Sequence, residues 1–200
     1  MSSTFRQQAD AQILDRAAAL FARHGFEHTS VQAVADAVGL SKAGLLHHFP
    51  SKDALHTSVL EQSTGLGQQI VDQVEHLPLG VERDRRAVEA LVDVALAHPG
   101  MVALLLAPVT RGDPVGADPV PDGAGAAALR AFGIDAEPDT QHTDPERVVR
   151  VLGTLAALAV LTLTAHQHDS TTAWRPFVVA TCSDALGHRR PAPSSHQVEA

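Results

Sequence analysis

The residues best suited to bind another molecule lie in one segment near the start of the chain, residues 29–52. The 200-residue sequence has only two lysines, Lys42 and Lys52, and both fall in this segment. Lysine ammonium groups bind phosphate oxygens, and the small residues Ala43 and Gly44 would let a helix approach base edges closely. The chemistry that this segment supports is contact with the major groove of duplex DNA.

The same segment predicts two short helices joined by a tight turn. Thr29 and Gln32 have the spacing of a capping box that would begin the first helix. Gly39 supplies the turn, Ser41 caps the second helix, and Pro50 ends it. This order is typical of a helix-turn-helix motif. The candidate DNA-contacting residues are Thr29, Ser30, Ser41, Lys42, Ala43, Gly44, Leu46, His47 and Lys52.

Helical spacing of apolar residues gives each predicted helix one buried face. Val31, Val34 and Val38 fall on one side of the first helix, and Leu45 and Phe49 on one side of the second. An alternative is a helical hairpin within a bundle, in which both lysines are ordinary solvated charges. The combination of caps, glycine turn and flanking lysines favours the DNA-binding interpretation.

From about residue 12 to residue 55 the sequence resembles the N-terminal domain of the tetracycline-repressor (TetR) family of bacterial transcription regulators. The resemblance rests on Ile13, Ala17, Leu20, Phe21, Gly25, Phe26, Thr29, Ser30, Val31, Val34, Ala35, the run from Gly39 to Lys42, and the run from His47 to Leu55. Members of the family often have a tyrosine where this sequence has Leu46, and that tyrosine commonly contacts DNA. Leucine cannot donate a hydrogen bond there, but it can contact a thymine methyl group.

The formal net charge of −8 is unevenly distributed along the chain. Residues 1–53 carry five basic and five acidic side chains, so all of the net negative charge lies downstream. Phosphate would repel the acidic remainder, which favours docking on DNA through the N-terminal region alone. A protein that is basic over its whole surface is excluded.

Composition indicates a cytoplasmic protein. Cys182 is the only cysteine, which excludes an internal disulfide framework, and residues 1–10 lack the apolar core of a signal peptide. The apolar run at residues 148–165 suggests a membrane span, but Arg150 interrupts it and no second span accompanies it. We expect a buried bundle helix there, and no membrane association.

The rest of the chain predicts helices separated by proline and glycine, so the expected fold is all-α. A long helix should begin after Ser51, a second should end at Pro99 and Gly100, and short helices should follow at 101–109 and 124–132. Loops are expected at 111–122 and 135–143. The predicted organisation is a three-helix DNA-binding domain over 1–50, a helical ligand-binding and dimerisation domain over 51–187, and a disordered tail over 188–200.

Two strongly apolar helices should close the chain. The first would be capped near Asp144 and be apolar almost all round, and the second would place Trp174, Phe177, Val178 and Cys182 on one stripe. The resemblance implies a homodimer through residues 145–187, whereas the alternative is that both helices complete a monomer core. Aliphatic residues in the helices around 66–74, 88–96, 101–109 and 148–163 would line an effector pocket, which favours an apolar small molecule.

Enzyme chemistry is disfavoured, because the sequence has no cofactor motif. His166 and His168 lie two apart and point to different sides of a helix end, so a metal site is not expected, and His24 and His28 are separated by a helix stop at Gly25. Cys182 is interpreted as an inert core thiol. The predicted function is a ligand-responsive repressor of a palindromic operator, released by its effector and without cofactor or metal. The alternative is a helical ligand-binding or interaction protein that has lost specific DNA binding.

Overall fold

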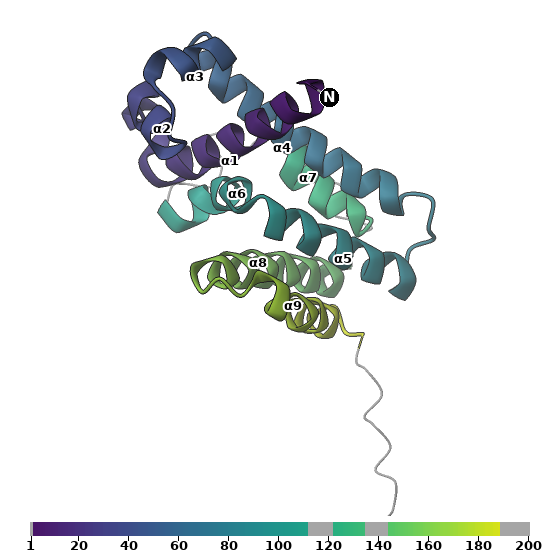
Figure 1. The fold of residues 1–200 in the computed structure, drawn as a ribbon. Coiled ribbons are helices and arrows are strands. Elements are labelled where there is room, and N and C mark those ends of the chain that lie inside the picture. Colours follow the sequence, from purple (N-terminus) through teal and green to yellow (C-terminus); the bar gives the residue numbers. More distant parts are fainter. Residues whose placement is uncertain (1, 112–121, 135–143, 189–200) are drawn as a thin grey trace, which may run out of the picture.

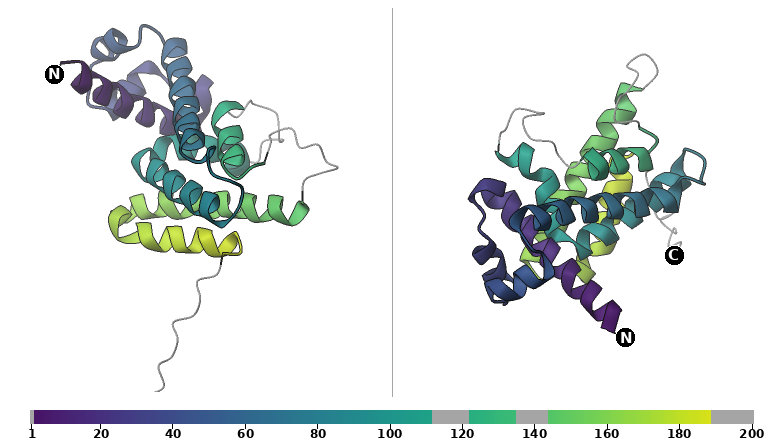
Figure 2. Two further views of the ribbon diagram at one scale, coloured as in Figure 1. Left: turned by 90° about the vertical axis from the view of Figure 1, so that its right-hand side faces the viewer. Right: turned by 90° about the horizontal axis from the view of Figure 1, so that it is seen from above.

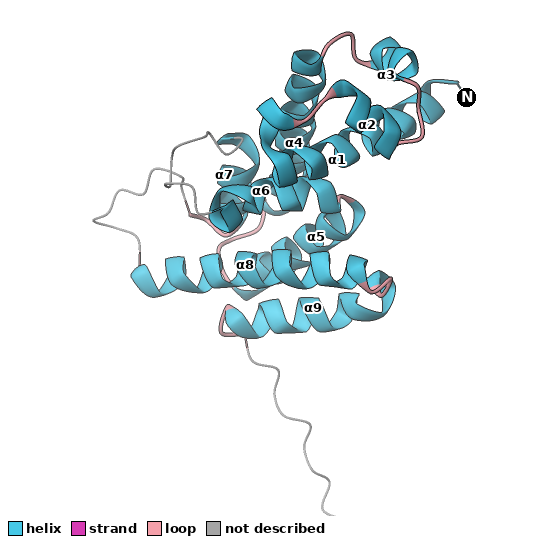
Figure 3. Cartoon of the chain, turned by 90° about the vertical axis from the view of Figure 1, so that its left-hand side faces the viewer, coloured by secondary structure: helices cyan, strands magenta, loops and turns pink. Residues whose placement is uncertain are grey.

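The computed structural model describes residues 2–111, 122–134 and 144–188. Within these ranges the chain forms helices and no strand (Figures 1 and 3), which confirms the all-α prediction. The first three helices lie at one end of the molecule, and the last two form a layer at the other end (Figure 1). Residues 112–121 of the loop predicted at 111–122, the loop predicted at 135–143 and residues 189–200 of the predicted tail lie outside the described residues, whereas residues 111 and 122 belong to helices.

The N-terminal helices are α1 (Ser2–His28), α2 (Val31–Ala37) and α3 (Lys42–His48). Within α1 the backbone breaks at Gly25, whose φ of 78° is a conformation that glycine adopts readily. The break separates His24 from His28, as the sequence predicted. The first core is built from residues of all three helices, together with Leu55 and Val59 of the next helix and Met101 from much later in the chain. It therefore extends past residue 50, where the sequence placed a domain boundary.

Helix α4 (Lys52–Val74) connects this first core to the second. Its N-terminus is capped as predicted, because the amide of Ala54 donates to Ser51 Oγ at 3.0 Å. Helix α7 (Asp122–Ala131) lies along it (Figure 2). Gly67 permits this close packing, since a Cβ atom there would lie 2.8 Å from Cβ of Ala127.

The Pro99–Gly100 pair ends one helix and begins another. Helix α5 (Val81–Ala97) and the next helix, α6 (Pro99–Arg111), meet at a bend of 102°. Proline is favourable in the first turn of a helix, where amide groups lack helical partners. The apolar piece predicted at 101–109 thus belongs to α6, and the bend turns the first residues of α6 toward α1.

Helices α8 (Pro145–Gln167) and α9 (Thr171–Ala185) pack side by side (Figure 2). Asp144 caps α8 as predicted and accepts a hydrogen bond from the amide of Glu146. Helix α8 is long and apolar enough to span a membrane by length and composition, yet it packs against α5, α6 and α9. The expectation that neighbours surround α8 holds for one side only, because Val149, Leu152 and Val160 are exposed in the single chain.

The second core lies among α4 to α9, and the side chain of Asp84 is buried in the same part of the molecule. Asp84 on α5 is 1% exposed and accepts two hydrogen bonds from Arg147, at 2.6 and 2.7 Å. His188 Nε2 lies 2.7 Å from the same carboxylate. Burial opposes ionisation of Asp84, but these hydrogen bonds outweigh it and hold the pKa of the carboxyl below its usual range. His188, the first residue of the predicted tail, is therefore part of the folded domain.

Candidate nucleic-acid interface

The first helix of the motif begins one residue later than the sequence predicted. Ser30, not Thr29, caps α2, because the amide of Ala33 donates to Ser30 Oγ at 3.0 Å. The Thr29 hydroxyl instead donates to the carbonyl oxygen of Gly25 at 2.7 Å, and Thr29 is 3% exposed. Thr29 therefore supplies a hydrogen bond to the carbonyl group at the break in α1. Gln32 reaches forward to Asp36 rather than back, so the predicted capping box is wrong.

The turn and the start of the second helix follow the prediction. Gly39 has a φ of 70°, and the next amide, that of Leu40, donates back to the carbonyl oxygen of Ala35 at 2.9 Å. Ser41 caps α3, with its Oγ accepting from the amide of Gly44 at 3.0 Å. A Cβ atom at Gly44 would lie 3.3 Å from this same oxygen. The missing side chain of Gly44 therefore makes room for the cap.

Helix α3 has distinct inner and outer faces. Leu45 is 1% exposed and packs in the first core together with Phe49. On the outer side Lys42, Ala43 and His47 are exposed, and Leu46 is half-buried. The two adjacent histidines differ, since His47 is exposed whereas His48 is partly buried and lies 2.6 Å from Asp10 Oδ1. The outer face thus presents a cation, a small residue and an imidazole to solvent.

Lys52 has partners within the protein. Its Nζ donates to the carbonyl oxygens of Phe26 and Glu27, at 3.0 and 3.4 Å, and lies 4.2 Å from the centroid of the Phe26 ring. These carbonyls end α1, where helical oxygens lack partners and positive charge is favoured. Lys52 therefore fastens the end of α1 to the start of α4, whereas no polar contact of Lys42 occurs among the described residues.

Two carboxylates of α1 that the sequence did not single out hold other helices. Asp10 Oδ1 accepts a hydrogen bond from His48 Nδ1 at 2.6 Å, which joins α1 to α3. Asp15 Oδ1 accepts from the amide of Met101 at 3.1 Å, which joins α1 to the first turn of α6. A Cβ atom at Gly100 would lie 1.8 Å from the main-chain oxygen of Asp15, so only glycine fits in this contact.

A groove of about 1220 Å³ opens beside these two contacts. It lies between α1, the end of α2, the bend between α5 and α6, and the end of α8, and His48, Asp15 and Gly100 contribute to its lining. This is not where the sequence placed an effector pocket. Many of the aliphatic residues expected to line that pocket, such as Ile70, Val88 and Leu158, pack together in the second core.

The histidines near the end of α8 and the single cysteine of the chain make contacts typical of structural residues. His166 Nε2 donates to the carbonyl oxygen of Leu96 at 2.7 Å, and the His168 ring stacks on Trp174. Burial raises the pKa of the Cys182 thiol to about 11, which agrees with an inert core thiol. In the described ranges no cluster of three or more histidine, cysteine, aspartate or glutamate residues could hold a metal ion.

The family model of bacterial regulatory proteins of the tetR family matches residues 13–59, which span α1 to α4 up to Val59. The N-terminal helix-turn-helix region of the chain therefore belongs to the TetR family. It is 27% identical over 158 residues to an uncharacterized HTH-type transcriptional regulator of Mycobacterium tuberculosis, a match that covers 78% of each chain. It is 33% identical over 81 residues to the HTH-type transcriptional repressor KstR2 of Rhodococcus jostii, covering 40% of this chain and 38% of that one.

Among solved structures, the chain has the fold of a protein from Pseudomonas aeruginosa PAO1 that is provisionally assigned as a transcriptional regulator. The TM-score is 0.50 at 20% identity, over 90% of this chain and 89% of the other. The likeness extends through both cores, which agrees with a helix-turn-helix region followed by a helical domain.

Proposed function

We propose that this TetR-family chain is a ligand-responsive transcriptional repressor that binds a palindromic operator as a homodimer in the cytoplasm. The observation that carries the proposal is the outer face of α3, where Lys42 and His47 are exposed on a helix whose opposite face is buried. A helix so held can enter the major groove with its outer side chains toward base edges and phosphates. Relatives named as regulators and repressors support it.

The proposed DNA-contacting set is centred on α3 and its cap. Ser41, Lys42, Ala43, Gly44, Leu46 and His47 belong to it, with Ser30 at the start of α2. The two remaining candidates have weaker support, because Thr29 is 3% exposed with its hydroxyl donating to Gly25, and the ammonium of Lys52 is bound at the end of α1. The charge balance of residues 1–53 means that few phosphate contacts supply the affinity, so its salt dependence should be shallow.

The homodimer is proposed through residues 145–187. Leu152 on α8 is 51% exposed and Phe177 on α9 is 72% exposed, and Val149 and Val160 are exposed on the same side of α8 as Leu152 by helical spacing. Large apolar side chains exposed on adjacent helices are typical of an interface. Two recognition helices of such a dimer would have to lie about 34–36 Å apart to enter successive turns of the major groove.

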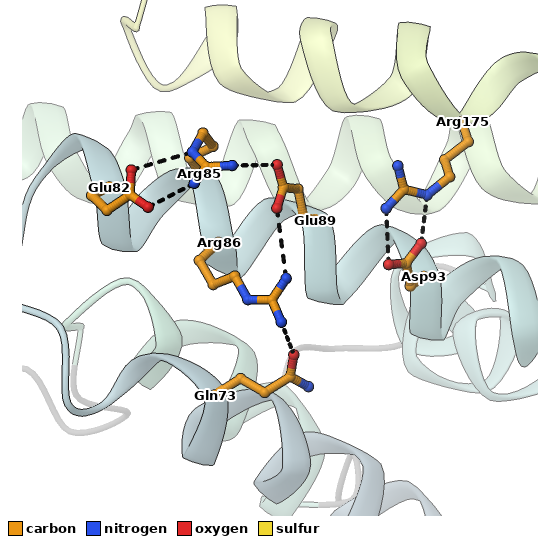
Figure 4. Close-up of polar contacts among 7 residues, drawn as sticks. All are labelled: Gln73, Glu82, Arg85, Arg86, Glu89, Asp93 and Arg175. Atoms are coloured by element: carbon orange, nitrogen blue, oxygen red, sulfur yellow. Dashed lines mark hydrogen bonds and ion pairs between the residues drawn. The ribbon is translucent and has the colours of Figure 1, made fainter.

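Polar contacts of α5 offer a route from this surface to the DNA-binding end. On one side Arg175 of α9 makes a bidentate contact with Asp93, at 2.6 and 2.9 Å. On the other, Arg86 donates to Gln73 of α4 at 3.0 Å, and both contacts are drawn in Figure 4. Since α4 begins directly after the recognition helix, a shift of α9 against α5 can reach α3 through α4.

The effector is proposed to be an apolar small molecule that binds among the aliphatic residues of α4, α5, α6 and α8. Binding there would separate helices that now pack in the second core, and α4 would carry the displacement toward α3. By linkage, an effector that lowers operator affinity by some factor must bind the operator complex more weakly by the same factor.

The test begins with selection of sequences from a random duplex pool, followed by gel-shift titration with the selected site and a scrambled site. Sequence-specific binding to a palindrome supports the proposal. The same affinity for selected and scrambled DNA would instead favour a helical binding protein that has lost DNA recognition. Apolar metabolites are then screened for release of the selected complex.

A further inference from the structure

Helix α1 contacts both the recognition helix, α3, and helix α6 of the second part of the chain. Two carboxylates five positions apart make these contacts. Asp10 accepts from His48 of α3, and Asp15 accepts from the amide of Met101 in α6. The two partners are far away in sequence, at separations of 38 and 86 residues. Helix α1 is continuous between these positions. Its two contacts therefore fix the position of α3 relative to α6.

The contact at Asp15 is a helix cap supplied by another helix. Met101 is the third residue of α6, so its amide is one of the groups that lack a partner within the helix. Asp15 provides both the acceptor oxygen and a negative charge at the positive end of the helix dipole. Gly100 brings the two backbones together, since a side chain there would overlap the main chain of Asp15.

The contact at Asp10 joins α1 to the end of the recognition helix. His48 is the last residue of α3, and the hydrogen bond to Asp10 holds that end of the helix on α1. Leu45 and Phe49 bury the inner face of α3 but are apolar contacts without strict direction. The Asp10–His48 hydrogen bond adds the directional contact that fixes how far the outer face is rotated.

We propose that Asp10 and Asp15 are positioning residues for operator binding: Asp10 orients the recognition helix on α1, and Asp15 orients α1 on α6. This inference rests on the proposed function as a dimeric operator-binding protein. It assigns a separate geometric role to each residue. Asp10 determines the fit of one recognition helix to one half-site, whereas Asp15 determines the separation of the two recognition helices in the dimer.

The experiment uses the full-length protein and its selected operator, together with operators whose half-sites are moved closer or apart by about one or two base pairs. Wild type should prefer one spacing. In Asp15→Ala the ratio of affinities for the preferred and the altered spacings should fall by about tenfold. This is the loss expected on removing one hydrogen bond to a charged group. Asp15→Asn keeps an acceptor oxygen at the amide of Met101 and should retain most of the preference. A flattened profile is a result that lowered stability alone does not produce.

Asp10→Ala should lower affinity for every spacing by about tenfold and leave the preferred spacing unchanged, while Asp10→Asn retains most of the affinity. A folded Asp15→Ala with the wild-type spacing profile overturns the role of Asp15. A folded Asp10→Ala with wild-type affinity overturns the role of Asp10. If wild type selects no sequence at all, the proposed function fails, which is a different result from either of these.

Gly100→Ala provides a second probe in case Asp15→Ala does not fold. The added methyl group must push α6 away from Asp15, so this variant should also flatten the spacing profile. Gly65→Ala in α4 is the matched control, because no heavy atom lies within 4 Å of the added Cβ atom. If Gly100→Ala shows the same spacing profile as Gly65→Ala, the role of the contact between α1 and α6 is overturned.

Discussion

The ammonium group of Lys52 lies 3.0 Å from the main-chain oxygen of Phe26 and 4.2 Å from the centroid of the ring of the same residue. The first residue of α4 thereby holds the last turn of α1. The other lysine, Lys42, is exposed on α3. The two lysines of the chain therefore have different surroundings, and substitution should separate their roles.

Lys42→Ala should weaken operator binding and reduce the slope of log affinity against log salt by about one unit, because one phosphate contact is lost. Its thermal stability should equal that of wild type. Lys52→Ala should instead lower the free energy of unfolding by about 1 kcal/mol, through loss of a charged hydrogen bond and a cation–π contact. Thermal melts and salt titrations of both variants check this. The same salt slope in Lys42→Ala and wild type would show that Lys42 does not contact phosphate.

Leu46 offers a test of gained affinity. It is half-buried on α3, at the position where members of the family often have a DNA-contacting tyrosine. Leu46→Tyr should raise operator affinity about fivefold if the new hydroxyl reaches the DNA backbone, which corresponds to about 1 kcal/mol for one hydrogen bond. Leu46→Phe is the control, since it adds the ring without the hydroxyl. Equal affinities of the two variants would mean that this position does not face the DNA backbone.

Sequence patterns predicted the parts of the site that depend on near neighbours. The caps at Ser41, Ser51 and Asp144 each involve an amide two or three residues away, and the turn at Gly39 needs only its own φ. Such features are local, so composition and spacing determine them. The buried face of α3 follows in the same way from helical periodicity.

The contacts that the sequence did not predict depend on the tertiary fold. Thr29 and Ser30 are adjacent hydroxyl residues, and either could cap α2. The Thr29 hydroxyl donates instead to the carbonyl oxygen of Gly25 at the break in α1. Gly100 follows a proline and indicated only a helix end, whereas its role is to let α6 approach Asp15. The Asp15–Met101 contact joins residues 86 positions apart, so no short-range sequence pattern predicts it.

The exposed apolar surface of α8 and α9 predicts the oligomeric state. Phe177→Arg should convert the dimer to a folded monomer, because the charge would be buried at the interface without a partner. Operator affinity should fall with it, since two half-sites are no longer bound together. Val81→Arg is the matched control, since Val81 is 60% exposed at the start of α5, outside residues 145–187. Sedimentation of both variants checks the prediction, and a wild type that sediments as a monomer would contradict it.

Asp84 predicts how stability depends on pH. Its carboxylate is buried with Arg147 and His188, so Asp84→Asn should lower the free energy of unfolding at neutral pH by about 3 kcal/mol, as expected for breaking a buried ion pair. Asp93→Asn is the control, because the Asp93–Arg175 pair is exposed and should contribute less than about 1 kcal/mol.

The sign of the pH dependence follows from the lowered pKa of Asp84. A carboxyl whose pKa is lower in the folded than in the unfolded protein stabilises the fold above the unfolded value of about 3.9, and loses this contribution as the pH falls through the folded value. Urea unfolding from neutral pH into acid should therefore show wild type and Asp84→Asn converging below about pH 4. A difference between the two proteins that stays constant down to the acid limit would mean that Asp84 stabilises the fold by packing rather than by charge.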